Sequence, residues 1–246
     1  MRTCAVIPAA GKGSRLGLDR PKILAPIDGP HTVWSILHEK LRPLVDHVQL
    51  VLSPDGSRWF DPMRLPAGVS VVVQDEPRGM GDAVFTGEMV WSRFDRILVV
   101  WGDQVNLSVR TISECLERQA SAGKRGVAFP LVELERPYVQ YDFGAEGRLD
   151  RIRQTREGDQ TDARGWSDVG LFALSTTGLT GEWKTYLSSC DLGSKTAEVN
   201  FLPFLVHLAR AGWRTRTFVI EDAAEARGVN TPEDLEFARR FALATV

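Results

Sequence analysis

Cysteine is scarce in this sequence, with Cys4, Cys115 and Cys190 the only three among 246 residues. An odd number of widely separated cysteines does not suit a disulfide framework and predicts reduced thiols, as in a cytoplasmic protein. The four histidines lack the spacing of zinc ligands, and no cysteine pair accompanies them. The sequence therefore predicts neither disulfides nor a zinc site.

Long hydrophobic runs and an excess of one charge are also missing. No apolar run approaches the ~20 residues that a helix needs to cross a bilayer, and the opening stretch Met1–Ile7 is too short for a signal peptide. The 30 Lys and Arg residues face 32 Asp and Glu residues, and 43% of the chain is hydrophobic. This composition excludes a disordered chain and a generally basic nucleic-acid binder. We expect a soluble cytoplasmic enzyme with no nucleic-acid or membrane partner.

Strand-like and helix-like patterns alternate through the first half of the chain. Short runs rich in β-branched residues are followed by stretches with apolar residues three and four positions apart. Such alternation favours an α/β fold with a doubly wound, mostly parallel sheet. The expected strands are 3–7, 47–52, 69–73, 96–100 and 126–130, and the expected helices are 32–41, 82–91 and 108–122.

The pattern changes after Pro130. Expected strands at 138–143, 148–154 and 169–174 surround a polar stretch, 155–166, that resembles a loop. A helix (198–211), a strand (214–220) and a helix (232–243) end the chain, the last with a Thr231 cap before Pro232. The prediction is one domain, residues 1–246. Its nucleotide-binding core comprises 1–130 and about 198–246, with a small β-rich acceptor-binding insert at about 131–197.

The loop of residues 9–22 follows the first expected strand and is rich in glycine and basic residues. It lacks the Walker spacing, and its third glycine comes one residue late for a dinucleotide fingerprint. Pro21 and Pro26 would also fall inside the helix that such a fingerprint opens. A local charge of +3, in a chain of net charge −2, instead predicts a polyphosphate site at the end of this strand. The expected phosphate-binding residues are Ala9, Ala10, Gly11, Lys12, Gly13 and Ser14.

A second polar segment follows the strand expected at 69–73. A glutamine amide such as that of Gln74 both donates and accepts hydrogen bonds, which suits the mixed edge of a pyrimidine base. The glycines after it would let the backbone lie against a flat ring, although they equally suit a simple turn before a helix. The candidate base-binding residues are Gln74, Gly79, Gly81 and Asp82.

Asp103 comes after the apolar strand 96–100, beside a glycine that clears space. A carboxylate at the carboxyl end of a central strand is well placed to hold Mg²⁺ on a phosphate, although it would also suit the cap of a turn. The sequence shows no recognisable catalytic triad. None is needed where the nucleophile is a phosphate monoester, because its second pKa near ~6 makes it an anion at neutral pH. Mg²⁺, Lys22 and Arg15 would lower the barrier between two polyanions.

The first loop carries a family resemblance. Its segment Ala-Ala-Gly-x-Gly-Ser-Arg-Leu, followed by Pro21-Lys22, resembles the signature loop of nucleotidyltransferases that make nucleotide-activated sugars. It is similar to the uridylyltransferase domain of bacterial N-acetylglucosamine-1-phosphate uridylyltransferases, without the acyltransferase domain. The resemblance implies a Rossmann-like fold of the nucleotide-diphospho-sugar transferase type. It also implies that Gly11, Gly13 and Arg15 grip the triphosphate and that Lys22 contacts the reacting phosphates.

The same resemblance extends to the metal and the base. Relatives carry a glutamine and a Gly-Thr-Gly segment, which here is Gly79-Met80-Gly81. Their catalytic metal is held by an aspartate and by the asparagine of a Gly-Val-Asn segment, which implies Mg²⁺ on Asp103 and Asn230. Arg15, Lys22 and Asp103 are therefore the expected catalytic residues.

The acceptor half follows the family pattern less closely. Aligned through Gly147, the family's tyrosine-glycine pair falls at Val139-Gln140, its later glutamate at Gln154 and its asparagine at Asp168. Glu198 matches an acidic residue in the family. The expected acceptor-binding residues are Gln140, Tyr141, Gln154, Asp168 and Glu198. Because a glutamine replaces a glycine, the identity of the acceptor stays open.

The leading hypothesis is a Mg²⁺-dependent nucleotidyltransferase that joins UTP or CTP to a phosphorylated small molecule, a sugar 1-phosphate by default, and releases pyrophosphate. The alternatives are a cytidylyltransferase acting on a non-sugar phosphate or phosphonate, and a catalytically silent nucleotide-sugar-binding regulator. Methylerythritol cytidylyltransferases are disfavoured because two of their characteristic segments are missing, and a nicotinamide oxidoreductase because of the prolines in the first loop. We expect a monomer or homodimer.

Overall fold

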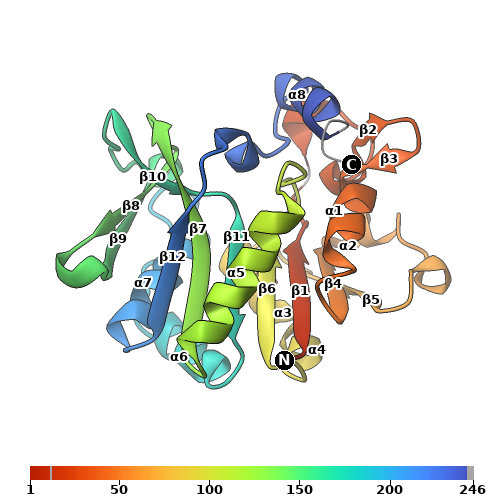
Figure 1. Cartoon of the computed structure of the whole chain (residues 1–246). Coiled ribbons are helices and arrows are strands. Elements are labelled where there is room, and N and C mark those ends of the chain that lie inside the picture. The colour runs from red at the N-terminus through yellow and green to blue at the C-terminus, as the bar shows by residue number, and fades with distance from the viewer. Residues whose placement is uncertain (12, 243–246) are drawn as a thin grey trace.

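The structure is a computed structural model that describes residues 1–11 and 13–242. Its centre is a sheet in the order β10-β7-β11-β6-β1-β4-β5, with β12 beside β7 (Figure 1). The strands are β1 (Thr3–Pro8), β4 (His47–Leu52), β5 (Val69–Val73), β6 (Arg96–Val100), β7 (Gly126–Glu135), β10 (Arg164–Asp168), β11 (Leu171–Ser175) and β12 (Arg214–Val219). The strands β6, β1, β4 and β5 run parallel, and β12 runs parallel to β7. Antiparallel pairs join β11 to β6 and β7, and β10 to β7.

Helices cover both faces of this sheet. They are α1 (Val33–Leu41), α2 (Pro54–Ser57), α3 (Met80–Thr86), α4 (Glu88–Trp91), α5 (Val109–Ala122), α6 (Leu179–Leu187), α7 (Leu202–Arg210) and α8 (Pro232–Ala242). In Figure 1, α5 crosses in front of the sheet, whereas α3 and α7 lie behind it. The doubly wound α/β class expected from the sequence is confirmed.

The two faces of the sheet build two separate cores, because neighbouring strand residues point to opposite sides. Ala5 and Ile7 of β1 pack with residues of α1, α5 and α8, whereas Cys4 and Val6 pack with residues of α3, α6 and α7. All four side chains are fully buried. The central strands therefore carry apolar residues on both faces, and this is why the parallel strands could be recognised in the sequence.

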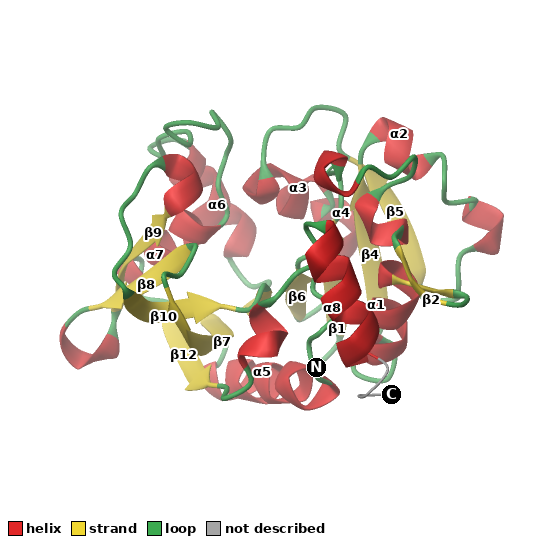
Figure 2. Cartoon of the chain, turned by 90° about the horizontal axis from the view of Figure 1, so that it is seen from above, coloured by secondary structure: helices red, strands yellow, loops and turns green. Residues whose placement is uncertain are grey.

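Two small sheets lie apart from the main one. β2 (Pro26–Asp28) pairs with β3 (His31–Thr32), and β8 (Val139–Phe143) pairs with β9 (Leu149–Gln154). Within the segment expected as an insert, β10 and β11 join the main sheet, and β8 and β9 form the separate one. Figure 2 shows this β8–β9 pair at one side of the molecule and α2 with β5 at the other.

Three sequence-based boundaries were wrong. The loop expected at 155–166 gives way to β10 at Arg164. The helix expected at 82–91 is broken at Gly87, whose carbonyl accepts a hydrogen bond from the buried Gln49 side chain. The helix expected from 198 begins only at Leu202, because Val199 exchanges backbone hydrogen bonds with Arg78 and Gly81 instead.

The loops that carry the candidate residues leave the same edge of the sheet. Residues 9–22 follow β1, residues 74–79 follow β5 and residues 101–108 follow β6, and the carboxyl ends of parallel strands meet at one edge. The segment before α8 reaches this edge as well, because the Val229 amide donates to the Asp103 carbonyl. Within the described part of the chain, no helix is long and apolar enough to cross a membrane.

Candidate active site

Three predicted site residues from distant parts of the chain meet at this edge. The Nζ atom of Lys22 lies 2.7 Å from Oδ2 of Asp103 and 3.1 Å from Oδ1 of Asn230. Lys22 opens a short 3-10 turn, Lys22–Leu24, and Asn230 directly precedes the cap of α8. The side chains of Lys22 and Asp103 are 22% and 15% exposed, so this ion pair is shielded from most of the solvent.

Two glycines permit this approach. A Cβ at Gly13, whose φ is +61°, would lie 2.9 Å from the Cβ of Lys22. A Cβ at Gly228 would lie 2.9 Å from the carboxyl carbon of Asp103. Neither position has room for a side chain. The backbone at Gly13 therefore lies directly against Lys22, and the backbone at Gly228 lies directly against Asp103.

The first loop opens onto a cavity of about 140 Å³ that holds Lys22 and Asp103 in its wall. The other lining residues are Pro8, Ala9, Gly11, Ile23, Met80, Trp101 and Gly102. Gly11 has no atom within 4 Å of the place where a Cβ would stand, so its backbone faces open space. Ala9 is anchored, because its amide donates to the Val51 carbonyl of β4.

The remaining predicted residues of this loop vary in position. Lys12 lies outside the described residues, and Ser14 begins a 3-10 turn, Ser14–Leu16. Ala10 is half-buried. Arg15 is exposed and has no ion-pair partner among the described residues, so its guanidinium is available to an anionic ligand.

The expected base-binding residues form a connected group after β5. The Gln74 side chain is 5% exposed, and its Nε2 donates to the Gly79 carbonyl and, at 2.7 Å, to Oδ2 of Asp82. The amide is therefore held in one orientation, with its Oε1 left as an acceptor. An acceptor fits the N–H groups that both uracil and cytosine carry on their base-pairing edge.

Gly79 and Gly81 are required by packing of the chain itself. A Cβ at Gly79, where φ is +111°, would lie 2.7 Å from the Cβ of Glu198, and one at Gly81 would lie 2.6 Å from the Trp183 ring. Both positions also press against the Val199 backbone. These glycines bring Glu198, a predicted acceptor residue, beside the nucleotide half of the site. Contact between either glycine and a base remains a prediction.

The oxygen atoms around Lys22 suit Mg²⁺. In the described part of the chain, no three His, Cys, Asp or Glu side chains gather as a metal cage. Mg²⁺ is commonly held by one or two carboxylates together with substrate phosphates. One carboxylate and one amide oxygen are therefore enough ligands from the protein. That both oxygens already face a single cation, the Lys22 ammonium, shows that they converge on one point.

In the acceptor half, the buried Tyr141 pairs with the half-buried Asp168. The Tyr141 hydroxyl donates to Oδ2 of Asp168 at 3.0 Å, and the Gly170 amide donates to Oδ1 at 2.7 Å. Burial raises the pKa of Asp168, against the effect of these two hydrogen bonds, and burial together with the adjacent carboxylate raises the pKa of Tyr141. Their polar atoms are largely engaged with each other.

Gln140 is likewise engaged within the chain. Its Nε2 donates to Asp142 and, at 2.7 Å, to Asp162, while its Oε1 accepts from the Asp162 amide at 2.8 Å. Arg153 bridges the same two aspartates. Gln140 therefore stabilises the turn around Asp162, and its predicted role in acceptor binding gains no support from this geometry.

Glu198 pairs with Arg156, whose guanidinium donates to its Oε2. Beside them, Glu157 accepts hydrogen bonds from Lys195, Thr196 and Asn200. Burial acts against ionisation of Glu157, but these hydrogen bonds prevail and lower its pKa to about 2. The segment that carries Glu198 is thus fastened to the end of β9 by an ionised carboxylate.

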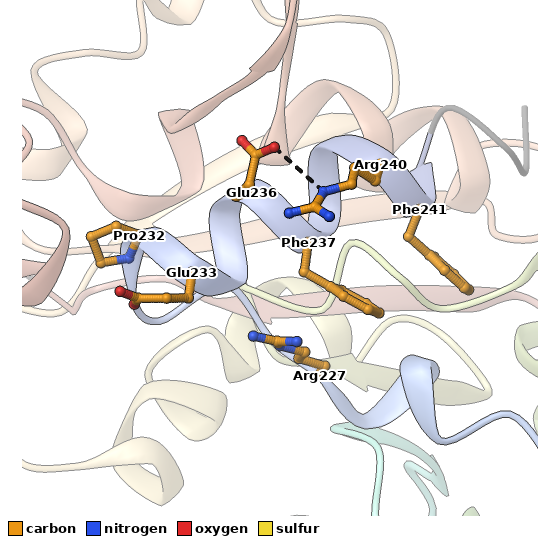
Figure 3. A pocket seen from close by; sticks show the side chains of 7 residues that line it. All are labelled: Arg227, Pro232, Glu233, Glu236, Phe237, Arg240 and Phe241. Carbon is orange, nitrogen blue, oxygen red and sulfur yellow. Dashed lines mark ion pairs between the residues drawn. The ribbon is translucent and has the colours of Figure 1, made fainter.

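Two larger cavities lie elsewhere. Gln154, the fifth predicted acceptor residue, lines one of about 540 Å³ between β9, α7 and the segment after α6. Figure 3 shows another, of about 740 Å³, on α8. It is lined by Arg227, Pro232, Glu233, Glu236, Phe237, Arg240 and Phe241, none of which is a predicted site residue.

Several residues of the site were not expected from the sequence. Met80 and Trp101 line the cavity beside Lys22, and Arg156 and Glu157 hold the Glu198 segment. Their contacts join positions far apart in the chain, which leaves no local signal. Lys40 lies outside the site but contacts the loop that follows β6, and its position on the apolar face of the helix expected at 32–41 is a signal in the sequence.

Comparison with known proteins places this chain in a family. Residues 5–168 match the MobA-like NTP transferase domain. The bifunctional protein GlmU of Rubrobacter xylanophilus is 31% identical over 96% of this chain and 49% of its own length. GlmU of Acidithiobacillus ferrooxidans is 28% identical over 98% of this chain and 52% of its own length. The chain thus spans about half the length of these relatives.

Solved structures share the fold. A Bacillus anthracis protein described as a glucose-1-phosphate thymidylyltransferase superposes with a TM-score of 0.74 over 98% of this chain and 95% of its own, at 16% identity. A CMP:2-keto-3-deoxy-manno-octonic acid synthetase complexed with CTP gives a TM-score of 0.69 over the whole of both chains, at 20% identity.

Fold and matched region together define a nucleotidyltransferase domain with a Rossmann-like sheet. The chain belongs to the family of MobA-like NTP transferase domains. The resemblance expected from the first loop and the enzyme class are confirmed.

Proposed function

We propose that this chain is a Mg²⁺-dependent nucleotidyltransferase that joins UTP or CTP to a phosphorylated small molecule, a sugar 1-phosphate, and releases pyrophosphate. The observation that carries the proposal is the convergence of Lys22, Asp103 and Asn230 beside the glycine loop. These residues supply one cation and two oxygen ligands at the carboxyl end of the sheet, where α/β folds bind nucleotides.

The chain's own groups act mainly on charge and position. The open backbone at Gly11 and the unpaired Arg15 would hold the β- and γ-phosphates. Asp103 and Asn230 would hold Mg²⁺, which neutralises phosphate charge when bound. The Lys22 ammonium would stabilise the charge that develops at the α-phosphoryl group.

The reaction needs no protein nucleophile. An oxygen of the acceptor phosphate forms a bond to the α-phosphorus of the triphosphate, and the bond from that phosphorus to the bridging oxygen of the β-phosphate breaks. Pyrophosphate leaves with the bonding electron pair. A phosphate monoester, with its second pKa near ~6, is a dianion for much of the time at neutral pH and attacks without a general base. The residues of the site accordingly include no histidine or cysteine.

The acceptor half favours a second candidate, a cytidylyltransferase acting on a non-sugar phosphate or phosphonate. Gln140 is fully engaged with Asp142 and Asp162, and Glu198 is neutralised by Arg156. Two predicted acceptor-binding residues are thus engaged within this chain. An acceptor with fewer hydroxyl groups places less demand on them.

Pyrophosphate release, measured with each of the four common ribonucleoside triphosphates and a panel of sugar 1-phosphates, other phosphate monoesters and phosphonates, tests the proposal. Turnover with a pyrimidine triphosphate and a sugar 1-phosphate would support it. Turnover with CTP and phosphonates alone would select the second candidate. Nucleotide binding without any pyrophosphate release would overturn both and indicate a catalytically silent regulator.

A further inference from the structure

Lys40 is a buried lysine in the last turn of α1. Its side chain is 7% exposed, and it shares its helix face with the buried Val33, Ile36, Leu37 and Leu41. Burial lowers the pKa of this ammonium, and the charge of Glu225 acts in the opposite direction. A cation in such a place costs free energy unless specific partners compensate for lost hydration, so its partners indicate what it does.

Those partners belong to the loop that carries Asp103. The Nζ atom of Lys40 donates to the carbonyl of Val105 at 2.8 Å and to that of Leu107 at 2.9 Å. Both residues are fully buried. Hydrogen bonds from a charged donor are stronger than neutral ones, so the ammonium fixes the backbone two and four residues beyond Asp103.

The opposite side of the same loop is tied to the segment that leads to Asn230. The buried Asn106 side chain donates to the Arg227 carbonyl at 2.8 Å. The Val229 amide donates to the carbonyl of Asp103 itself at 2.9 Å. The loop therefore lies between α1 and the segment before α8, and both predicted metal ligands depend on its position.

A carboxylate completes this arrangement. Glu225, which is 7% exposed, accepts from the backbone amide of Ser108 at 2.8 Å and from the Thr111 hydroxyl at 2.9 Å. The cation on α1 binds carbonyls of the loop, and the anion before α8 binds the donors that follow them. The Lys40 ammonium thus satisfies carbonyl acceptors of this stretch of backbone, and the Glu225 carboxylate satisfies an amide donor.

We propose that Lys40 is a positioning residue that sets the distance between Asp103 and Asn230 by holding the loop that carries Asp103 against the segment that leads to Asn230. The inference rests on the proposed function, because it assigns these two oxygens to a divalent cation. Lys40 touches neither the nucleotide nor the metal, and its effect reaches the site through the backbone of residues 103–107.

The test is metal affinity in three variants. Removal of groups that orient metal ligands commonly weakens metal binding by about 10–100-fold, so Lys40→Met should raise the Mn²⁺ dissociation constant by about that factor. Lys40→Arg keeps a charged donor and should restore at least part of the affinity. The titration uses the whole chain with Mn²⁺ alone, followed by electron paramagnetic resonance, and thermal unfolding is recorded for each variant.

Arg96→Met is the matched control. Arg96 is also a half-buried cation that donates to a backbone carbonyl, that of Leu116 at 2.7 Å, but at the opposite end of β6 from Asp103. Burial lowers its pKa too. Loss of Arg96 should lower the melting temperature. It should leave the Mn²⁺ dissociation constant within about twofold of the wild type, since Arg96 does not contact the loop that carries Asp103.

Equal Mn²⁺ affinity of folded Lys40→Met and the wild type would overturn the inference, as would an equal loss in Arg96→Met. If Lys40→Met does not fold, Asn106→Ala, which cuts the opposite tie of the loop, must show the same weakening. Asp103→Ala separates the two claims. If Asp103→Ala binds Mn²⁺ as tightly as the wild type does, the metal site of the proposed function is refuted, whatever the result for Lys40→Met.

Discussion

The ammonium of Lys22 lies 2.7 Å from the carboxylate of Asp103, although 81 positions separate them in the chain. It also lies 3.1 Å from the Asn230 amide oxygen, so an internal cation stands between the two groups expected to hold Mg²⁺. A divalent ion on these oxygens must displace the ammonium. The phosphates of a bound nucleotide would offer the ammonium new anionic partners, which couples metal binding to nucleotide binding.

Lys22→Ala should therefore change metal binding and catalysis in opposite directions. Loss of a group that stabilises transition-state charge typically costs about 10²–10³ in kcat, and we expect a loss of that size in pyrophosphate release. Without the competing ammonium, Mn²⁺ should bind the free protein more tightly than it binds the wild type. Mn²⁺ titration by electron paramagnetic resonance measures this, and weaker binding in the variant would contradict the competition.

Asn230→Ala should weaken the metal site without removing its carboxylate. We expect the Mg²⁺ concentration for half-maximal activity to rise about tenfold or more, with a smaller change in kcat at saturating Mg²⁺, because Asp103 and the phosphates still hold the ion. Steady-state rates over a Mg²⁺ series provide the measurement. A loss of kcat that no Mg²⁺ concentration restores would show that the amide acts otherwise.

Gly79→Ala and Gly11→Ala should separate stability from binding. A Cβ at Gly79 meets the Glu198 Cβ at 2.7 Å in a left-handed backbone conformation, so the variant should lose about 1–3 kcal/mol of unfolding free energy. A Cβ at Gly11 meets nothing within 4 Å, and its effect on unfolding should stay within about 0.5 kcal/mol.

Gly11→Ala should instead act on nucleotide binding. The methyl group of Gly11→Ala would stand at the wall of the cavity that holds Lys22, and so should raise the KM for the nucleotide. Urea denaturation of both variants measures the unfolding free energies, and steady-state kinetics measure the KM for the nucleotide. Equal stability of Gly79→Ala and the wild type would refute the packing argument.

Glu157 should stabilise the fold in a pH-dependent way. Its pKa in the folded chain is about 2, below the ordinary value of a glutamate. The stabilisation is therefore complete above pH ~4.3 and is lost as the pH falls toward the folded pKa. Glu157→Gln should cost about 1–3 kcal/mol at pH 7 because its buried donors lose an ionised acceptor.

The difference in unfolding free energy between Glu157→Gln and the wild type should shrink between pH 4 and pH 2, as urea denaturation at each pH will show. Glu117→Gln is a suitable control, because Glu117 is exposed and accepts only a 3.4 Å bond from Ser113. A penalty for Glu157→Gln that does not change with pH would indicate that shape, and not charge, holds the Glu198 segment.

The parallel strands and the convergence of Lys22, Asp103 and Asn230 were predictable from the sequence. β1 and β6 are buried on both faces over the apolar runs 4–8 and 97–100, so the carboxyl ends of these strands could be located in the sequence, and the loops that follow them had to meet at one edge. Asn230 was identified through the resemblance of its segment to the family's Gly-Val-Asn, and it directly precedes a helix start in which Asp234 and Thr231 bond to each other.

The acceptor half was less accessible to such reasoning. β10 is an edge strand that pairs only with β7 within the main sheet, and its residues Arg164–Asp168 lack an apolar run. Glu157 holds residues about 40 positions away through side-chain contacts that no local pattern announces. The acceptor itself depends on which of these groups remain free in the folded chain, and that is a property of tertiary structure.

The most direct test of the account is to follow the α-phosphorus of the nucleotide. With UTP or CTP labelled at that atom and a sugar 1-phosphate as acceptor, the label should appear in the sugar-linked product, one for each pyrophosphate released. Lys22→Ala should slow this transfer about 10²–10³-fold, and Asp103→Ala should abolish it. Label that stays in the triphosphate, or appears only as free nucleoside monophosphate, would contradict the account, as would full transfer by Asp103→Ala.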